Sequence, residues 1–128
     1  MSAKLLLSIA AGGAFGAVGR FLVMSGIGHW FPSVFPWATL SVNVIGSFVL
    51  GAVIEIMALV WSPSPEIRSM LVVGVLGAFT TFSTFSLDVY FLIERNAFQQ
   101  AGFYIMTSVV FSIAAFMAGL YVFRNILA

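Results

Sequence analysis

Hydrogen-bonding side chains recur at helical spacing inside apolar stretches of this 128-residue chain. Residues four apart lie on one face of a helix. Two sets have this spacing, a 39–47 ladder of Thr39, Asn43 and Ser47 and a 104–112 ladder of Tyr104, Ser108 and Ser112. These groups donate hydrogen bonds without formal charge, and in a membrane such side chains commonly bond one helix to another or bond back to their own backbone. Two ladders of one type, together with a Thr/Ser run in a third apolar segment, favour a functional role, and the packing interpretation stays open at this point.

A third polar run, GAFTTFSTFS at residues 77–86, interrupts an otherwise apolar segment at 67–94. As a straight helix that segment would be about 42 Å long, against a hydrocarbon core of about 30 Å. We therefore predict that it is tilted or broken, with Thr80 and Thr81 at its midpoint. A break would free backbone carbonyls, which bind cations. The alternative is an unbroken helix with a hydroxyl-rich packing face.

The composition requires membrane-spanning elements to position these residues. The chain is 62% hydrophobic and 7% charged, whereas a soluble domain carries about 25% charged residues. We predict an all-α membrane protein with one four-helix domain over residues 1–128. The predicted helices are 5–28, 38–61, 67–94 and 97–127, separated by short loops, of which the first two contain proline. The first resembles a signal peptide, but more membrane segments follow it, so we interpret it as a true span.

Several function classes are excluded by what the sequence lacks. The net charge is +1 and there is no cysteine, so we expect no nucleic-acid partner, no disulfide and no thiolate chemistry. One histidine and four acidic residues leave no metal-ligand set and no nucleophile–base pair. An enzyme is therefore the least favoured class.

The basic residues give a weak orientation signal. Lys4, Arg68 and Arg124 fall on the side of the termini, and Arg20 and Arg95 on the other. The positive-inside rule needs a clearer bias than this to fix one topology. The distribution permits dual topology, in which subunits insert both ways and form an antiparallel homodimer.

Other features indicate packing and charge positions. Small residues in the first helix allow close helix approach, which we expect between subunits; they are Gly12, Gly13, Gly16 and Gly19. Arg20 and Asp88 lie deeper than the other charges and toward the same side, so they could pair or line a vestibule. Glu55 lies near a helix end, where we expect it to act as an interfacial anchor.

Three stretches together resemble the Fluc, or CrcB, family of fluoride channels. They are GAFGAVGRF (13–21), ATLSVNVIGSF (38–48) and GVLGAFTTFSTFSLD (74–88). The chain length, the four helices and the 104–112 ladder match as well, so the resemblance covers essentially the whole chain. This sequence differs in having Ala38 and Ala78 where glycine is usual, and Asp88 where glutamate is usual.

The resemblance implies an antiparallel, dual-topology homodimer in the bacterial inner membrane, with two pores that export cytoplasmic fluoride by passive electrodiffusion. It implies a central structural Na⁺ held by the backbone carbonyls of Gly77 and Thr80. It also implies a fluoride pathway along Asn43, Phe82, Ser83, Phe85, Tyr104, Ser108 and Ser112. Arg20 and Asp88 would be vestibule or structural charges.

Two other functions stay open from the residues alone. A small dual-topology multidrug/proton exchanger would need an intramembrane acid that exchanges protons, and Glu55 is the only candidate. A non-transporting structural subunit would use the ladders for packing alone. Neither a basic residue nor an acid lies midway along the spans, which favours a pore with weak multi-site binding.

Overall fold

A computed structural model describes residues 1–128. The chain consists of helices joined by short irregular segments, and it contains no strand. The elements are α1 (Ala3–Trp30), α2 (Trp37–Leu59), α3 (Pro65–Ser69), η1 (Met70–Leu76), α4 (Gly77–Phe79), α5 (Phe82–Glu94) and α6 (Phe98–Leu127). The consecutive elements α3 to α5 form one span, Pro65–Glu94, and all four spans are long and apolar enough to cross a membrane. The prediction of four membrane helices is confirmed, with boundaries close to those expected.

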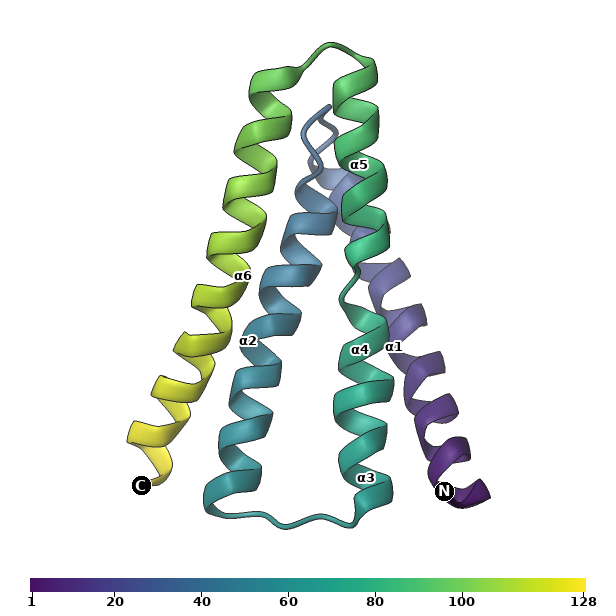
Figure 1. Cartoon of the computed structure of the whole chain (residues 1–128), viewed down its shortest axis with the longest axis vertical. Coiled ribbons are helices and arrows are strands. Elements are labelled where there is room, and N and C mark those ends of the chain that lie inside the picture. Colours follow the sequence, from purple (N-terminus) through teal and green to yellow (C-terminus); the bar gives the residue numbers. More distant parts are fainter.

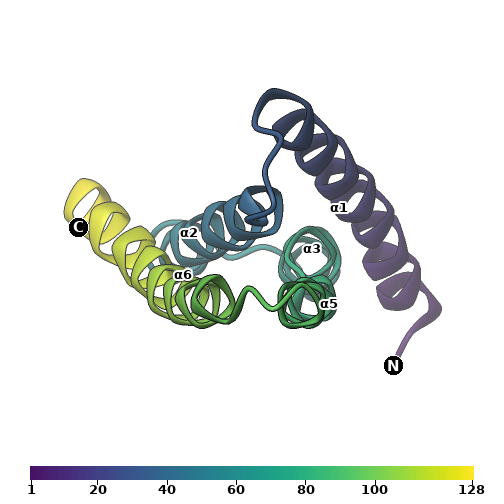
Figure 2. The same cartoon turned by 90° about the horizontal axis from the view of Figure 1, so that it is seen from above.

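Successive spans run in opposite directions, so the two termini and the 60–64 loop lie at one end (Figure 1). Seen from above, α2 and the third span lie between α6 on one side and α1 on the other (Figure 2). α6 packs chiefly on α2, and α1 packs chiefly on η1 and α4. The functional residues predicted on α2, the third span and α6 therefore come from neighbouring elements.

Short polar residues mark where the helices begin. The side chains of Ser2, Ser64 and Thr81 each accept a hydrogen bond from the backbone N–H three residues later, which satisfies one of the unpaired donors of a helix N-terminus. Pro65 follows Ser64 in the first turn, where its missing N–H costs nothing. Asn96, with φ of 59°, makes the turn between α5 and α6.

The third span is broken near the middle of its length, as predicted. Thr80 and Thr81 have extended backbone, with ψ of 158° and 119°, between α4 and α5. Just before the break, η1 (Met70–Leu76) is a π-helix, which the sequence analysis did not predict. Such wide turns are uncommon and are frequent at functional sites.

Glycines bring α1 into backbone contact with η1. A Cβ added to Gly12 would overlap the Met70 carbonyl, and one on Gly16 would overlap the Val75 carbonyl. A Cβ on Gly74 would lie 2.7 Å from the Ile9 carbonyl oxygen. The expectation that these glycines pack between subunits is wrong for Gly12 and Gly16, because small residues permit close approach to any neighbour and their spacing does not say which one.

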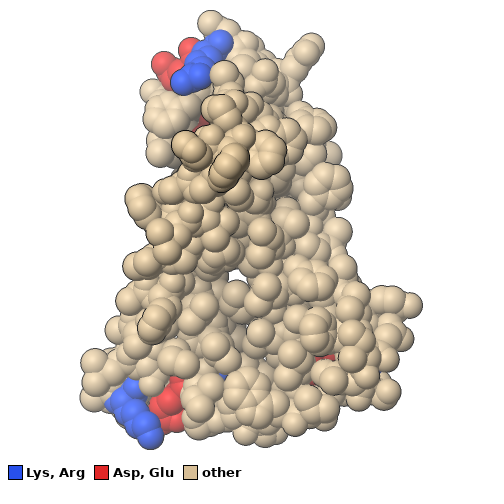
Figure 3. Space-filling model, turned by 180° about the vertical axis from the view of Figure 1, so that it is seen from behind, with Lys and Arg blue, Asp and Glu red and all other residues tan.

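The surface is that of a multi-pass membrane protein. On the face shown in Figure 3, charged side chains gather at the two ends of the molecule and uncharged residues fill the band between them. Few hydrophobic side chains are buried within the chain, and five of them pack into one cluster, comprising Leu40, Phe85, Leu92, Ala101 and Tyr104. Most large hydrophobic side chains are exposed, so lipid or another subunit must cover them.

Candidate functional site at the helix break

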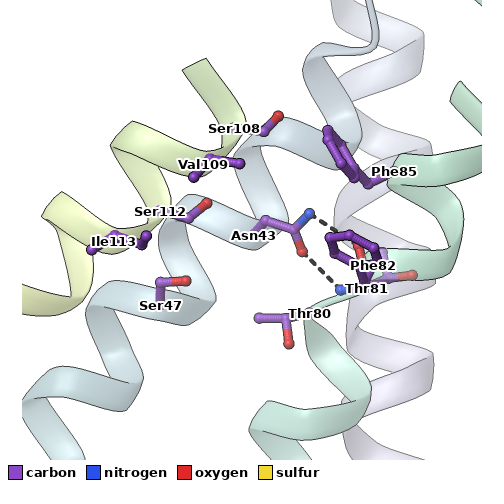
Figure 4. Close-up of a pocket in the computed structure, with 10 residues that line it drawn as sticks. All are labelled: Asn43, Ser47, Thr80, Thr81, Phe82, Phe85, Ser108, Val109, Ser112 and Ile113. Atoms are coloured by element: carbon purple, nitrogen blue, oxygen red, sulfur yellow. Dashed lines mark hydrogen bonds between the residues drawn. The ribbon is translucent and has the colours of Figure 1, made fainter. Parts of the chain in front are cut away.

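A cavity of about 300 Å³ opens beside the break in the third span (Figure 4). Its lining residues come from α2, from the break and the start of α5, and from α6; they are Asn43, Ser47, Thr80, Thr81, Phe82, Phe85, Ser108, Val109, Ser112 and Ile113. No acidic or basic side chain lines it. Residues from both predicted ladders thus meet in one uncharged cavity.

Asn43 fixes the break to α2. Its Nδ2 donates to the Thr81 carbonyl at 3.0 Å, and its Oδ1 accepts from the Thr81 N–H at 2.7 Å, as the dashed lines in Figure 4 show. A backbone released from helical bonding is thereby satisfied by one side-chain amide. An amide nitrogen carries two donors, so Asn43 retains one N–H beyond the bond to Thr81.

The serine hydroxyls supply further donors. Ser108 Oγ is buried and has no hydrogen-bond partner within the chain. A buried hydroxyl without a partner is costly, and Ser108 lines the cavity, so its hydroxyl is available to a group in that space. Ser47 and Ser112 line the same cavity from α2 and α6.

Two phenylalanines lie where α5 begins. The ring centroids of Phe82 and Phe85 are 5.3 Å apart with an interplanar angle of 50°. Phe85 is buried, whereas Phe82 is 76% exposed. Aromatic rings carry positive charge at their edges, so this pair can present weakly attractive groups to an anion in the cavity.

Carbonyl groups at the break have lost their helical partners. In a continuous helix the Thr81 N–H would bond the Gly77 carbonyl, but here it bonds Asn43. The Thr84 N–H would bond the Thr80 carbonyl, but it bonds Thr81 Oγ1 at 3.1 Å. The carbonyls of Gly77 and Thr80 are therefore not held by the bonds of a continuous helix.

Comparison with known proteins decides the family. Residues 7–120 match the family model described as CrcB-like protein, Camphor Resistance (CrcB). The chain is 50% identical over 125 residues to a Fluoride-specific ion channel FluC from Rhodospirillum centenum, covering 98% of this chain and 99% of that one. The chain belongs to the CrcB/FluC family.

Other relatives of this CrcB/FluC chain have the same name. A Fluoride-specific ion channel FluC from Nitrobacter winogradskyi is 47% identical, covering 94% of this chain and 96% of that one. A protein of the same name from Agrobacterium fabrum is 49% identical, covering 92% of this chain and 94% of that one. These relatives are bacterial and are named as channels, not enzymes, in agreement with the sequence-based interpretation.

Two predicted pathway residues of this CrcB/FluC chain lie outside the cavity. Ser83 is exposed and its Oγ lies 3.3 Å from Thr81 Oγ1. Tyr104 is fully buried, donates from its hydroxyl to Asp88 Oδ2 at 2.9 Å, and packs its ring 5.0 Å from that of Phe85. Tyr104 therefore supports Phe85 and does not line this cavity.

The charged residues are arranged differently from the predicted pairing. Arg20 does not pair with Asp88. Its Nε donates to the Ala78 carbonyl at 3.0 Å, and its Nη1 lies 3.5 Å from Thr84 Oγ1. Both partners of Arg20 lie near the break, and Thr84 is one helical turn before Asp88. Asp88 instead accepts a hydrogen bond from Tyr104.

Glu55 is not a solvent-facing anchor. The residue is 5% exposed, and both carboxylate oxygens accept from Arg124, Oε1 from Nε at 3.0 Å and Oε2 from Nη2 at 3.4 Å. The anchor interpretation is wrong, because a glutamate one turn inside a helix end can turn inward when a basic residue of the neighbouring helix reaches it.

The sequence analysis did not assign three of the lining residues to the pathway. Thr81 was placed at the predicted break, and that position was a usable signal for its place in the lining. Val109 and Ile113 are adjacent to Ser108 and Ser112 along α6. As apolar residues in an apolar helix they carried no signal that separates a pore lining from a lipid contact.

Proposed function

We propose that this protein is a fluoride-selective channel of the bacterial inner membrane that exports cytoplasmic fluoride by passive electrodiffusion. The observation that carries the proposal is the uncharged cavity in which the Asn43 amide, the hydroxyls of Ser108 and Ser112, and the Phe82–Phe85 pair meet. The names of the relatives support the choice of ion.

This chemistry suits a small, strongly hydrated anion. Neutral donors replace the hydrogen bonds of water, and the ring edges add a weak attraction. A lysine or arginine in the cavity would bind anions tightly and slow their exit, whereas conduction needs weak binding at several sites. The lining contains no such residue.

We infer that the working unit is an antiparallel, dual-topology homodimer with two pores. Phe82 is 76% exposed in the single chain, and Gly77 is exposed as well. A pathway in a membrane must be enclosed by protein, and a second copy would supply the missing wall. The weak charge bias of the loops is compatible with insertion in both directions.

A structural Na⁺ on the axis of that dimer fits the break. The carbonyls of Gly77 and Thr80 have lost their helical partners, and hard cations prefer oxygen ligands. Two carbonyls from each copy would supply about four oxygens to one monovalent ion without a carboxylate. Bound there, Na⁺ would interact with the negative oxygen ends of these carbonyl groups in place of the lost N–H donors.

The multidrug/proton exchanger is less well supported. Such a carrier needs an intramembrane carboxylate that alternates between a proton and a cationic substrate. Glu55 is the only candidate, and both of its oxygens accept hydrogen bonds from Arg124. It also lies outside the lining of the cavity.

The test is anion efflux from liposomes that contain the purified protein. We expect electrogenic fluoride release with negligible chloride release, measured with ion-selective electrodes after addition of a potassium ionophore. Replacing Phe82 and Phe85 separately by isoleucine should reduce the flux while the dimer persists on size exclusion. A folded, dimeric protein that releases no fluoride would refute the proposal.

A further inference from the structure

The two ladders extend beyond the cavity. On α2, Gly51 and Glu55 continue the four-residue spacing of Thr39, Asn43 and Ser47. On α6, the series Tyr104, Ser108 and Ser112 continues through Phe116 and Leu120 to Arg124. The ion pair between Glu55 and Arg124 therefore lies along the same interface between α2 and α6 as the cavity, and we call this interface the α2–α6 seam. Glu55 is two turns beyond Ser47, and Arg124 is three turns beyond Ser112.

Between the cavity and the ion pair, α2 and α6 are in backbone contact. A Cβ added to Gly51 would overlap the Phe116 carbonyl, and one added to Gly119 would overlap the Phe48 carbonyl. Both glycines are buried. No ion can pass between the helices at this contact, so the α2–α6 seam is closed on the side of the termini.

The ion pair is a second fixed point, one turn beyond the glycine contact. Glu55 is buried and its partner is the planar guanidinium of Arg124, which is held by two hydrogen bonds and whose side chain is 64% exposed. A bidentate pair restricts orientation as well as distance. It is the only salt bridge in the chain.

We propose that the Glu55–Arg124 pair positions α6 on α2 so that the serines of the cavity keep the spacing that selects fluoride over larger anions. The proposal rests on the proposed channel function. The glycine contact fixes where the two helices touch, and the ion pair fixes the angle at which they cross there. Together they determine the separation of Ser47 and Ser112, which lie one turn away on the opposite side of the contact.

Selectivity depends on that separation. Hydrogen-bond donors on facing helices can satisfy a small anion together only within a narrow range of spacing. When the crossing angle is free to vary, arrangements with a wider gap are populated, and a wider gap admits chloride. Neither Glu55 nor Arg124 touches the ion in this account; both act through the position of α6.

The test compares fluoride and chloride release from liposomes for Arg124→Gln, Glu55→Gln and the double variant. Arg124→Gln removes the exposed partner but leaves the Glu55 carboxylate buried without its counter-charge, so the double variant, in which both side chains are neutral, tests the ion pair without that penalty. The matched control is Arg68→Gln, which removes an exposed arginine at the same end of the molecule that forms no salt bridge. Thermal unfolding and size exclusion verify the dimer of each variant.

We expect the fluoride-to-chloride ratio to fall about two- to fivefold in Arg124→Gln, the range that an ion pair with a mostly exposed arginine can supply. The fluoride-to-chloride ratio of the double variant should be no lower than that of either single variant, because the two side chains act as a unit. Arg68→Gln should keep the wild-type ratio. A folded Arg124→Gln dimer with the wild-type ratio would overturn the inference, whereas a wild-type protein that releases no fluoride would overturn the proposed function itself.

Discussion

At the scale of single residues, Asn43 combines two tasks. Its carbonyl oxygen and one N–H hold the Thr81 backbone, and its amide also lines the cavity. A single side chain thus stabilises the broken backbone and contributes a donor to the proposed pathway. Thr81 also has two roles, because its hydroxyl caps α5 while its backbone binds Asn43.

Replacing Asn43 with aspartate tests both tasks. A carboxylate can still accept from the Thr81 N–H, but it cannot donate to the Thr81 carbonyl, and it places a negative charge beside the proposed anion pathway. We expect a fall in fluoride efflux of tenfold or more, and a loss of about 1–3 kcal/mol in unfolding free energy from the unsatisfied carbonyl. Efflux and denaturant unfolding measure the two effects.

Asn125→Asp is the matched control for that substitution. Asn125 lies on the exposed side of α6 and bonds only the Tyr121 carbonyl of its own helix. The same chemical change there should leave efflux near the wild-type rate. Equal losses at the two positions would mean that charge alone, and not position at the break, accounts for the effect.

At the scale of elements, the third span is shaped by its neighbours. α1 approaches η1 at backbone distance through Gly12, Gly16 and Gly74. On the other side, α2 approaches the break through Gly46, where a Cβ would overlap the Thr80 methyl group. The broken span is therefore held between α1 and α2, and its two halves are not free to straighten into one helix.

Gly16→Ala tests the contact between α1 and η1. The new methyl group would overlap the Val75 carbonyl and lie 3.0 Å from its Cα, so backbone would have to move. We expect a loss of about 1–3 kcal/mol in stability, the usual cost of overpacking, and a lower unfolding temperature in detergent.

Gly13→Ala is the control on the same helix. A Cβ there has nothing within 4 Å, and alanine is favoured over glycine inside a helix by about 0.5–1 kcal/mol. Its unfolding temperature should equal or exceed that of the wild type. Unfolding of Gly16→Ala at the wild-type temperature would contradict the close packing of α1 on η1.

The sequence predicts the spans and much of the cavity because their signals are local. Apolar length identifies the helices, the excess length of the third span indicates its break, and four-residue spacing places Asn43 with Ser47 and Ser108 with Ser112. The partners of Gly12, Arg20 and Glu55 could not be predicted. Their spacing describes one helix face, whereas the identity of the neighbour depends on how all four spans pack.

At the scale of the whole molecule, the single chain leaves part of the proposed pathway uncovered. Large hydrophobic residues remain exposed along its length, and Phe82 is among them. Gly77 also lies at the surface, with a carbonyl freed from helical bonding. A second copy facing this surface would cover Phe82 and bring two further carbonyls to the proposed Na⁺.

Sodium removal tests that assembly. An ion that binds only to the folded dimer stabilises the dimer by mass action. Prolonged exchange into sodium-free potassium buffer should therefore lower the unfolding temperature and the fluoride flux. Returning Na⁺ should restore both. Thr80→Val should keep this sodium dependence, because the Thr80 hydroxyl already bonds the Leu76 carbonyl and only the backbone would bind the ion. An unfolding temperature that does not vary with sodium would refute the site.

Dual topology can be tested directly because the chain has no cysteine. Ser62→Cys lies in the loop between α2 and α3, and Gln99→Cys lies at the start of α6, on the opposite end of the molecule. Both positions are exposed. If the chain inserts both ways, a membrane-impermeant thiol reagent applied to intact cells should label about half of the molecules of each variant, because the loops carry too weak a charge bias to favour one orientation. Complete labelling of one variant with none of the other would establish a single orientation and exclude the antiparallel dimer.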